Sequence, residues 1–180
     1  MKLKLLVLVL ALQIAWLFGT VVVQERALAR GRIILLETRP VDPRDLLRGD
    51  YLALNYKISD VPVNLFLPPV KNRLPTGARI FVALAPATNH FYEIVEASAT
   101  KFVPPPGAVL VEGRSAWSRN AANSIHVEYG IERYYVSEGM GNPSGKLTVQ
   151  VVVPASGHPK IKEVFVDGKP YAEAAKNGTQ

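Results

Sequence analysis

The chain has 180 residues, of which 48% are hydrophobic, enough for one membrane-spanning segment and one soluble domain of about 145 residues. The formal net charge is +6, but the basic residues are scattered without a run of three, so nucleic acid is not an expected partner. The chain contains no cysteine, which excludes disulfides, thiolate metal sites and thiol catalysis of the sortase type.

The first part, residues 1–30, is predicted to be a basic head, a membrane anchor and a short linker. Lys2 and Lys4 precede residues 5–23, which carry no charge. About 19 helical residues nearly cross a hydrocarbon core of about 30 Å. We therefore expect a single transmembrane helix that contacts the lipid bilayer through residues 5–23.

A cleaved signal peptide is the alternative to this anchor, with Ala27-Leu28-Ala29 as its cleavage site. Signal peptides usually have an apolar core of about 7–15 residues that ends close to such a site. Here the apolar run is longer, and Gln24, Glu25 and Arg26 separate it from the alanines. These two features favour an uncleaved anchor.

The stretch from Val41 to Tyr56 is the richest in special residue types. Asp42-Pro43 predicts the start of a helical turn, and Gly49 with Asp50 predicts a chain reversal. Tyr51 to Ile58 then alternates like a half-buried strand. One face carries Leu52, Leu54, Tyr56 and Ile58, and the other carries Tyr51, Ala53, Asn55 and Lys57.

Two blocks of the chain resemble a known family. Gly49-Asp50-Tyr51, Leu54 and Tyr56 spell Gly-Asp-Tyr-x-x-Leu-x-Tyr, similar to the signature of the GDYXXLXY family of bacterial membrane-anchored proteins. Residues 129–139 are similar to the family's other characteristic stretch. The family is named for its motif because no activity was established for it. The resemblance implies an exported domain and, as partner, a multi-pass membrane protein of the same envelope.

Charge around the anchor does not by itself favour export. Four arginines follow the apolar segment within a short distance (Arg26, Arg30, Arg32 and Arg39), against Lys2 and Lys4 before it. The basic head is nevertheless the usual start of an exported anchor. Together with the resemblance, it leads us to expect a single-pass protein of the cytoplasmic (inner) membrane whose C-terminal domain is periplasmic or otherwise extracytoplasmic.

The domain itself, residues 31–171, is predicted to be mainly β: an antiparallel sandwich or a partly open barrel. The first strand, Ile33 to Thr38, is expected to pair with Tyr51 to Ile58. Val61 to Gly77 is expected to be an extended, proline-rich loop. Asp167-Gly168 predicts a tight turn, and residues 172–180 a flexible tail with a fraying helical turn. Further strands are expected at residues 79–85, 91–102, 109–115, 124–129, 131–136, 146–153 and 161–166.

Metal or cofactor binding is not expected, although two groups of residues deserve a test. Asp42, Asp45 and Asp50 could hold a hard cation, but interleaved arginines explain them as ion pairs and turn residues. His90, His126 and His158 lie far apart and form no zinc-binding spacing.

An envelope hydrolase of the signal-peptidase type is a second alternative, since such enzymes use a serine activated by a deprotonated lysine. Ser98 with Lys101 and Ser144 with Lys146 are the nearest pairs in sequence. The usual Ser-Met-x-Pro context of the nucleophile is missing, so no catalytic residue is predicted.

The leading hypothesis is a non-catalytic envelope protein whose exported β-domain binds a membrane-protein partner. A cation-binding or small-ligand module remains an alternative, as does the hydrolase. For the second block, the alternative to a binding role is a purely structural one: a pair of edge strands whose tyrosines pack their rings and expose their hydroxyls. The predicted binding surface comprises Arg48, Gly49, Asp50, Tyr51, Leu54, Tyr56, Tyr129, Gly130, Glu132, Arg133, Tyr134 and Glu138.

Overall fold

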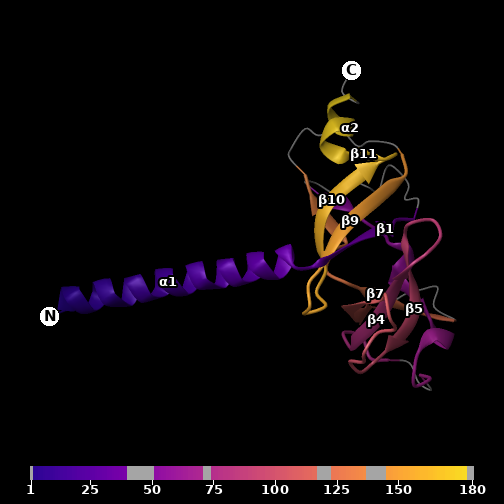
Figure 1. Ribbon diagram of the computed structural model, residues 1–180, viewed down its shortest axis with the longest axis horizontal. Coiled ribbons are helices and arrows are strands. Elements are labelled where there is room, and N and C mark those ends of the chain that lie inside the picture. Colours follow the sequence, from indigo (N-terminus) through magenta and orange to yellow (C-terminus); the bar gives the residue numbers. More distant parts are fainter. Residues whose placement is uncertain (1, 40–50, 71–73, 117–122, 137–144, 178–180) are drawn as a thin grey trace. The chain divides into compact units, whose positions relative to one another are not determined.

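The computed structural model describes residues 2–39, 51–70, 74–116, 123–136 and 145–177 (Figure 1). The chain divides into two compact units, Met1–Gly31 and Arg32–Gln180. The first unit is a helix and the second is a β-domain.

The helix of the first unit, α1, runs from Lys2 to Ala29. At a rise of 1.5 Å per residue it is about 42 Å long. Its apolar side chains surround the axis instead of lining one face, which is typical of a membrane span. The hydroxyl of Thr20 donates to the carbonyl oxygen of Leu17 at 2.8 Å, so this polar group is satisfied within the helix. By length and composition, the helix can cross a membrane.

The described residues of the second unit form three antiparallel sheets, none of which closes into a barrel. The prediction of a mainly β domain is thus confirmed. The four-stranded sheet has the order β1 (Arg32–Glu37), β9 (Leu147–Val153), β10 (Lys160–Val166) and β11 (Lys169–Pro170). The five-stranded sheet has the order β3 (Asp60–Pro62), β7 (Ser124–Glu128), β6 (Val109–Ala116), β4 (Arg79–Pro86) and β5 (Tyr92–Ser98). The two-stranded sheet pairs β2 (Tyr51–Ala53) with β8 (Arg133–Tyr135).

Residues from all three sheets share one hydrophobic core. In β9 the alternation is strict, because Leu147, Val149, Val151 and Val153 are buried while the residues between them are partly exposed. In β4 the burial is almost continuous from Ile80 to Leu84, as expected of a strand inside a sheet covered on both faces. The described part of the domain also includes three short helices: η1 (Lys57–Ser59), η2 (Val63–Leu65) and α2 (Tyr171–Asn177).

The predicted pairing of the first strand with Tyr51 to Ile58 is wrong. β1 pairs over its whole length with β9, from Arg32 opposite Val153 to Glu37 opposite Thr148. The expected pairing survives only as one isolated bridge between Thr38 and Tyr56. The reason is length, since β9 offers an alternating apolar face of seven residues whereas β2 ends at Ala53.

The strand predicted for Tyr51 to Ile58 is also too long, but its alternation is correct. Only Tyr51–Ala53 is a strand, and Lys57–Ser59 is the 3-10 turn η1. All four residues predicted to share one face are nevertheless buried, namely Leu52, Leu54, Tyr56 and Ile58. The period of two therefore identified the residues that face the core, not the residues that join a ladder.

The strand boundaries elsewhere shift by a few residues. β5 ends at Ser98, four residues before the predicted end, and β8 is confined to Arg133–Tyr135. The turn at Asp167-Gly168 is confirmed, because both residues have positive φ values, 48° and 81°, and join β10 to β11. A helical segment does follow, but α2 starts at Tyr171, whose side chain is buried and fixes the beginning of the helix in the core.

Candidate binding surface

The structure brings the two motif blocks side by side. β2, from the first block, pairs antiparallel with β8, from the second block. Tyr51 lies opposite Tyr135, Leu52 opposite Tyr134, and Ala53 opposite Arg133. Segments separated by some 80 residues in sequence thus form one small sheet, as a shared binding surface requires.

Two buried tyrosines connect the blocks, because each donates a hydrogen bond from its own block to the backbone of the other. Tyr56 of the first block donates its hydroxyl to the carbonyl oxygen of Ile131 at 2.7 Å. Tyr129 of the second block donates its hydroxyl to the carbonyl oxygen of Ile58 at 2.8 Å. Burial raises the pKa of both phenols, and the nearby Glu132 carboxylate raises it further. Both hydroxyls therefore stay protonated and keep donating at neutral pH.

Glu132 holds the turn between these tyrosines and β8. Its carboxylate accepts the backbone N–H of Tyr129 at 2.5 Å and that of Gly130 at 2.9 Å. Gly130 has a φ of +80°, a conformation that residues with a side chain rarely adopt. The carbonyl oxygen of Glu132 also accepts the N–H of Leu54 at 2.8 Å.

Five of the predicted site residues therefore support the surface structurally. Leu54, Tyr56 and Tyr129 are buried beneath it, and Gly130 and Glu132 form the turn. The expectation that the tyrosines of the second block expose their hydroxyls is wrong for Tyr129, because its hydroxyl is used inside the core.

The exposed part of the sheet is an aromatic and cationic patch, which we define as Tyr51, Arg133 and Tyr135. The rings of Tyr51 and Tyr135 are 6.0 Å apart between centroids and tilted by 57°. The guanidinium carbon of Arg133 lies 5.4 Å from the centroid of the Tyr51 ring. Tyr135 is 72% exposed, which is unusual for so large an apolar ring.

Tyr135 lies within the second block that was predicted to form the surface, although it was not singled out as one of its binding residues. Its position could have been derived from Arg133, because residues two apart in a strand lie on the same face. Tyr134, which was predicted, lies on the other face and packs edge-on against Tyr171 of α2, with ring centroids 6.0 Å apart. Arg48, Gly49, Asp50 and Glu138 lie outside the described residues.

Two open cavities flank the patch, and Arg133 and Tyr135 line both. One, of about 350 Å³, we call the β8 groove. It is lined by Gly130, Ile131, residues 133–135 and residues 159–161. The other, of about 380 Å³, is lined by Glu128, Gly130, Glu132, Arg133 and Tyr135.

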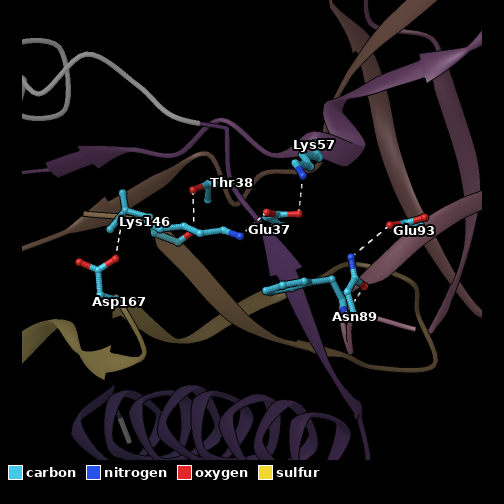
Figure 2. Close-up of polar contacts among 9 residues, drawn as sticks. Glu37, Thr38, Lys57, Asn89, Glu93, Lys146 and Asp167 are labelled. Carbon is cyan, nitrogen blue, oxygen red and sulfur yellow. Dashed lines mark hydrogen bonds and ion pairs between the residues drawn. The ribbon is translucent and has the colours of Figure 1, made fainter. Parts of the chain in front are cut away.

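A second polar cluster surrounds Glu37 at the end of β1 (Figure 2). The ammonium groups of Lys57 and Lys146 lie 2.5 Å and 2.6 Å from its two carboxylate oxygens. Hydrogen bonds from Lys146 and then Lys57 hold the pKa of Glu37 below its ordinary value. A cavity of about 230 Å³ opens beside it, walled largely by apolar and aromatic residues of η1, β3 and β5. The cluster joins β1 to η1 and to the start of β9.

Replacing Glu37 by Gln should lower the free energy of unfolding by about 1 kcal/mol at neutral pH, because two ion pairs are lost. A lowered folded pKa gives stability that is present above the unfolded pKa of about 4.5 and is lost as the pH falls through the folded value. The Glu37→Gln variant should therefore lose less stability than the native protein when acidified below about pH 4.5. Urea unfolding of the full-length protein in detergent at several pH values measures this. Glu93→Gln is the control, since Glu93 contacts only Asn89, at 3.5 Å, within the described residues; equal pH dependence of all three proteins contradicts the assignment.

Asp60 links β3 to β7 in the same region. Its carboxylate accepts from Nδ1 of His126 at 2.7 Å and from the guanidinium of Arg39. Burial alone would raise the pKa of Asp60, but these two hydrogen bonds outweigh it and lower the pKa. His126, one of the histidines considered for zinc, thus has a carboxylate partner.

The structure assembles no metal site among the residues it describes, because no group of three or more His, Asp or Glu side chains converges there. Ser98 and Lys101, the pair considered for a hydrolase, do not contact each other in the described structure either: Ser98 is buried and its hydroxyl contacts Thr100, whereas Lys101 is exposed. The ammonium of Lys146 is neutralised by Glu37. Ser144 and the three aspartates considered for a cation lie outside the described residues.

Comparison with protein families gives one match, to the model described as GDYXXLXY protein, over residues 13–164. The chain belongs to the GDYXXLXY family. No curated protein and no solved structure matches the chain. The match includes both blocks of the two-stranded sheet, so the family's motif can be interpreted residue by residue: Leu54 and Tyr56 are core residues, and Tyr51 is the part of the motif that reaches the exposed patch.

Proposed function

We propose that this member of the family is a non-catalytic, single-pass protein of the inner membrane whose periplasmic β-domain binds a multi-pass membrane protein. The observation that carries the proposal is the patch of Tyr51, Arg133 and Tyr135. Tyrosine and arginine are among the residue types enriched at the centres of protein interfaces, and here Arg133 and Tyr135 pack against the ring of Tyr51 while they remain exposed and Tyr51 remains partly exposed.

The support beneath the patch strengthens this argument. A surface made of ordered side chains loses less conformational freedom on binding. The Tyr56 and Tyr129 hydrogen bonds and the Glu132 turn fix the backbone that carries the patch. The anchor helix is a second argument for a membrane-protein partner. A membrane-spanning α1 would keep the β-domain close to the bilayer, where such a partner lies.

Partner capture tests the proposal. Full-length protein isolated in mild detergent from its own membranes should bring down one specific multi-pass protein. The Arg133→Ala, Tyr135→Ala double variant should retain about tenfold less, the loss expected when central Tyr and Arg side chains are truncated. Val103→Ala is the matched control, because Val103 is 91% exposed but belongs to the loop between β5 and β6. If the native protein comes down alone, or the double variant keeps the partner, binding through this patch is wrong.

The side of the membrane is tested by cysteine labelling, which the cysteine-free chain makes unambiguous. A Val103→Cys variant should react with a membrane-impermeant maleimide in cells whose outer membrane has been permeabilised, because the proposal places the domain in the periplasm. The native chain, which has no thiol, gives the background. Labelling that appears only after the inner membrane is broken would place the domain in the cytoplasm.

A further inference from the structure

The β8 groove lies between two strands, each of which has unpaired residues along one edge in the described part of the chain. β8 pairs with β2 on one edge. β10 pairs with β9 along one edge, but with β11 only at Phe165 and Val166 on the other. The groove takes its walls from β8 and from Pro159, Lys160 and Ile161 at the start of β10.

The free edge of β8 presents backbone donors and acceptors. Leu54 donates its N–H to the carbonyl oxygen of Glu132, which sets the phase of the antiparallel ladder. Hydrogen-bonded pairs alternate along such a ladder, so Leu52 and Tyr134 bond each other across it. The N–H and C=O groups of Arg133 and Tyr135 consequently point away from β2, towards the free edge.

The side chains of the groove define what it would accept. Among the described residues that line it, the charged ones are both cationic, Arg133 and Lys160. The carboxylate of the neighbouring Glu132 is already occupied by the N–H groups of Tyr129 and Gly130. The other walls are apolar or aromatic, with Ile131, Ile161 and Pro159 among them. Such a groove complements an extended segment that carries both carboxylates and apolar side chains.

We propose that the β8 groove binds an extended, acidic segment of the partner protein, which adds as a strand to the free edge of β8. Main-chain hydrogen bonds to Arg133 and Tyr135 hold the segment, as in other cases of strand addition, and Arg133 and Lys160 select its carboxylates. The inference rests on the proposed function and names the part of the partner that is recognised.

Crosslinking from both walls of the groove tests the geometry. Photoreactive benzoylphenylalanine is placed at position 135, 160 or 103 of the full-length protein in its own membranes. Positions 135 and 160 should crosslink to a single stretch of one partner, and that stretch should contain Asp or Glu. Position 103 should not crosslink to it. Crosslinks from 135 and 160 to separate stretches, or to a stretch without an acidic residue, overturn strand addition.

Charge reversal tests the chemistry. The Arg133→Glu, Lys160→Glu variant should capture about tenfold less partner, and lysines in place of the acidic residues of the crosslinked stretch should restore capture. Lys101→Glu, an exposed substitution elsewhere, should have no effect. An unchanged yield with the double reversal refutes recognition of carboxylates. If only this experiment fails while the Arg133→Ala, Tyr135→Ala variant still loses the partner, the proposed function stands and the recognition of an acidic segment does not.

Discussion

Replacing Tyr56 or Tyr129 by alanine should lower the free energy of unfolding of the β-domain by about 3–5 kcal/mol, because each change empties the volume of a buried aromatic ring. Phenylalanine variants separate the ring from the hydroxyl. Tyr56→Phe leaves the carbonyl of Ile131 without its donor, and Tyr129→Phe does the same to Ile58. Each should cost about 1–2 kcal/mol. Urea unfolding of the full-length protein, followed by circular dichroism in detergent, measures these differences.

Tyr135→Ala is the control, since the same side chain is removed from a site that is 72% exposed. It should change stability by less than about 0.5 kcal/mol. If Tyr56→Ala and Tyr129→Ala lose no more stability than Tyr135→Ala, then Tyr56 and Tyr129 do not hold the two blocks together.

Alkaline pH provides an independent check on the same hydroxyls. Their pKa values are raised in the folded state, so their contribution is complete below the unfolded value of about 10 and is lost as the pH rises beyond it. Each phenol removes about 1.4 kcal/mol per pH unit in that range. The double phenylalanine variant should lose this steep dependence.

A Gly113→Ala substitution should cost about 3 kcal/mol, although it adds only one methyl group. An ideal Cβ at position 113 would lie 2.4 Å from Cγ1 of Val127, 2.9 Å from the carbonyl oxygen of Glu128 and 3.0 Å from Cδ1 of Tyr129. Val127 and Tyr129 are buried, and the carbonyl belongs to a paired strand, so no neighbour can move away cheaply. β6 and β7 must therefore separate, and Tyr129 must shift with them.

The matched substitution is Arg114→Ala, one residue along the same strand. The Arg114 side chain is exposed and its one hydrogen bond to the described residues is a 3.4 Å contact with the carbonyl oxygen of Gly77, so its removal should cost less than about 0.5 kcal/mol. Thermal unfolding of both variants decides the matter. A Gly113→Ala protein as stable as the native one would mean that β6 and β7 are not packed as closely as described.

Local patterns in the sequence were sufficient to predict which residues of a strand are buried and where one tight turn lies. The alternation of Leu52, Leu54, Tyr56 and Ile58 predicted their burial, and Asp167-Gly168 predicted its turn. The choice of partner strand is not local. Several segments alternate equally well, and β1 joined β9 because that strand offered the longer apolar face.

The candidate surface could be predicted only in part, because it too depends on contacts between segments that are distant in sequence. Both motif blocks were identified, but the sequence does not show that Tyr129 turns inward, because its acceptor belongs to Ile58, far along the chain. Nor does it show that Glu132 binds backbone amides instead of a partner, since this depends on the left-handed backbone of Gly130. Tyr135 belongs to the second block, but the sequence does not show that its ring, and not that of Tyr134, is the exposed one, because this depends on how β8 pairs with β2.

The partnership of β1 with β9 also determines when the domain can form. β1 begins three residues after the anchor helix, yet its register partners lie near the other end of the domain. Ile34 and Leu36, which are buried in the folded protein, have nothing to pair with until the segment up to Val153 is available. Because loop closure over such a distance is slow, folding should be limited by this last pairing. An apolar strand thus stays without its partner strand while the rest of the domain is synthesised, and a chaperone would have to shield it from aggregation.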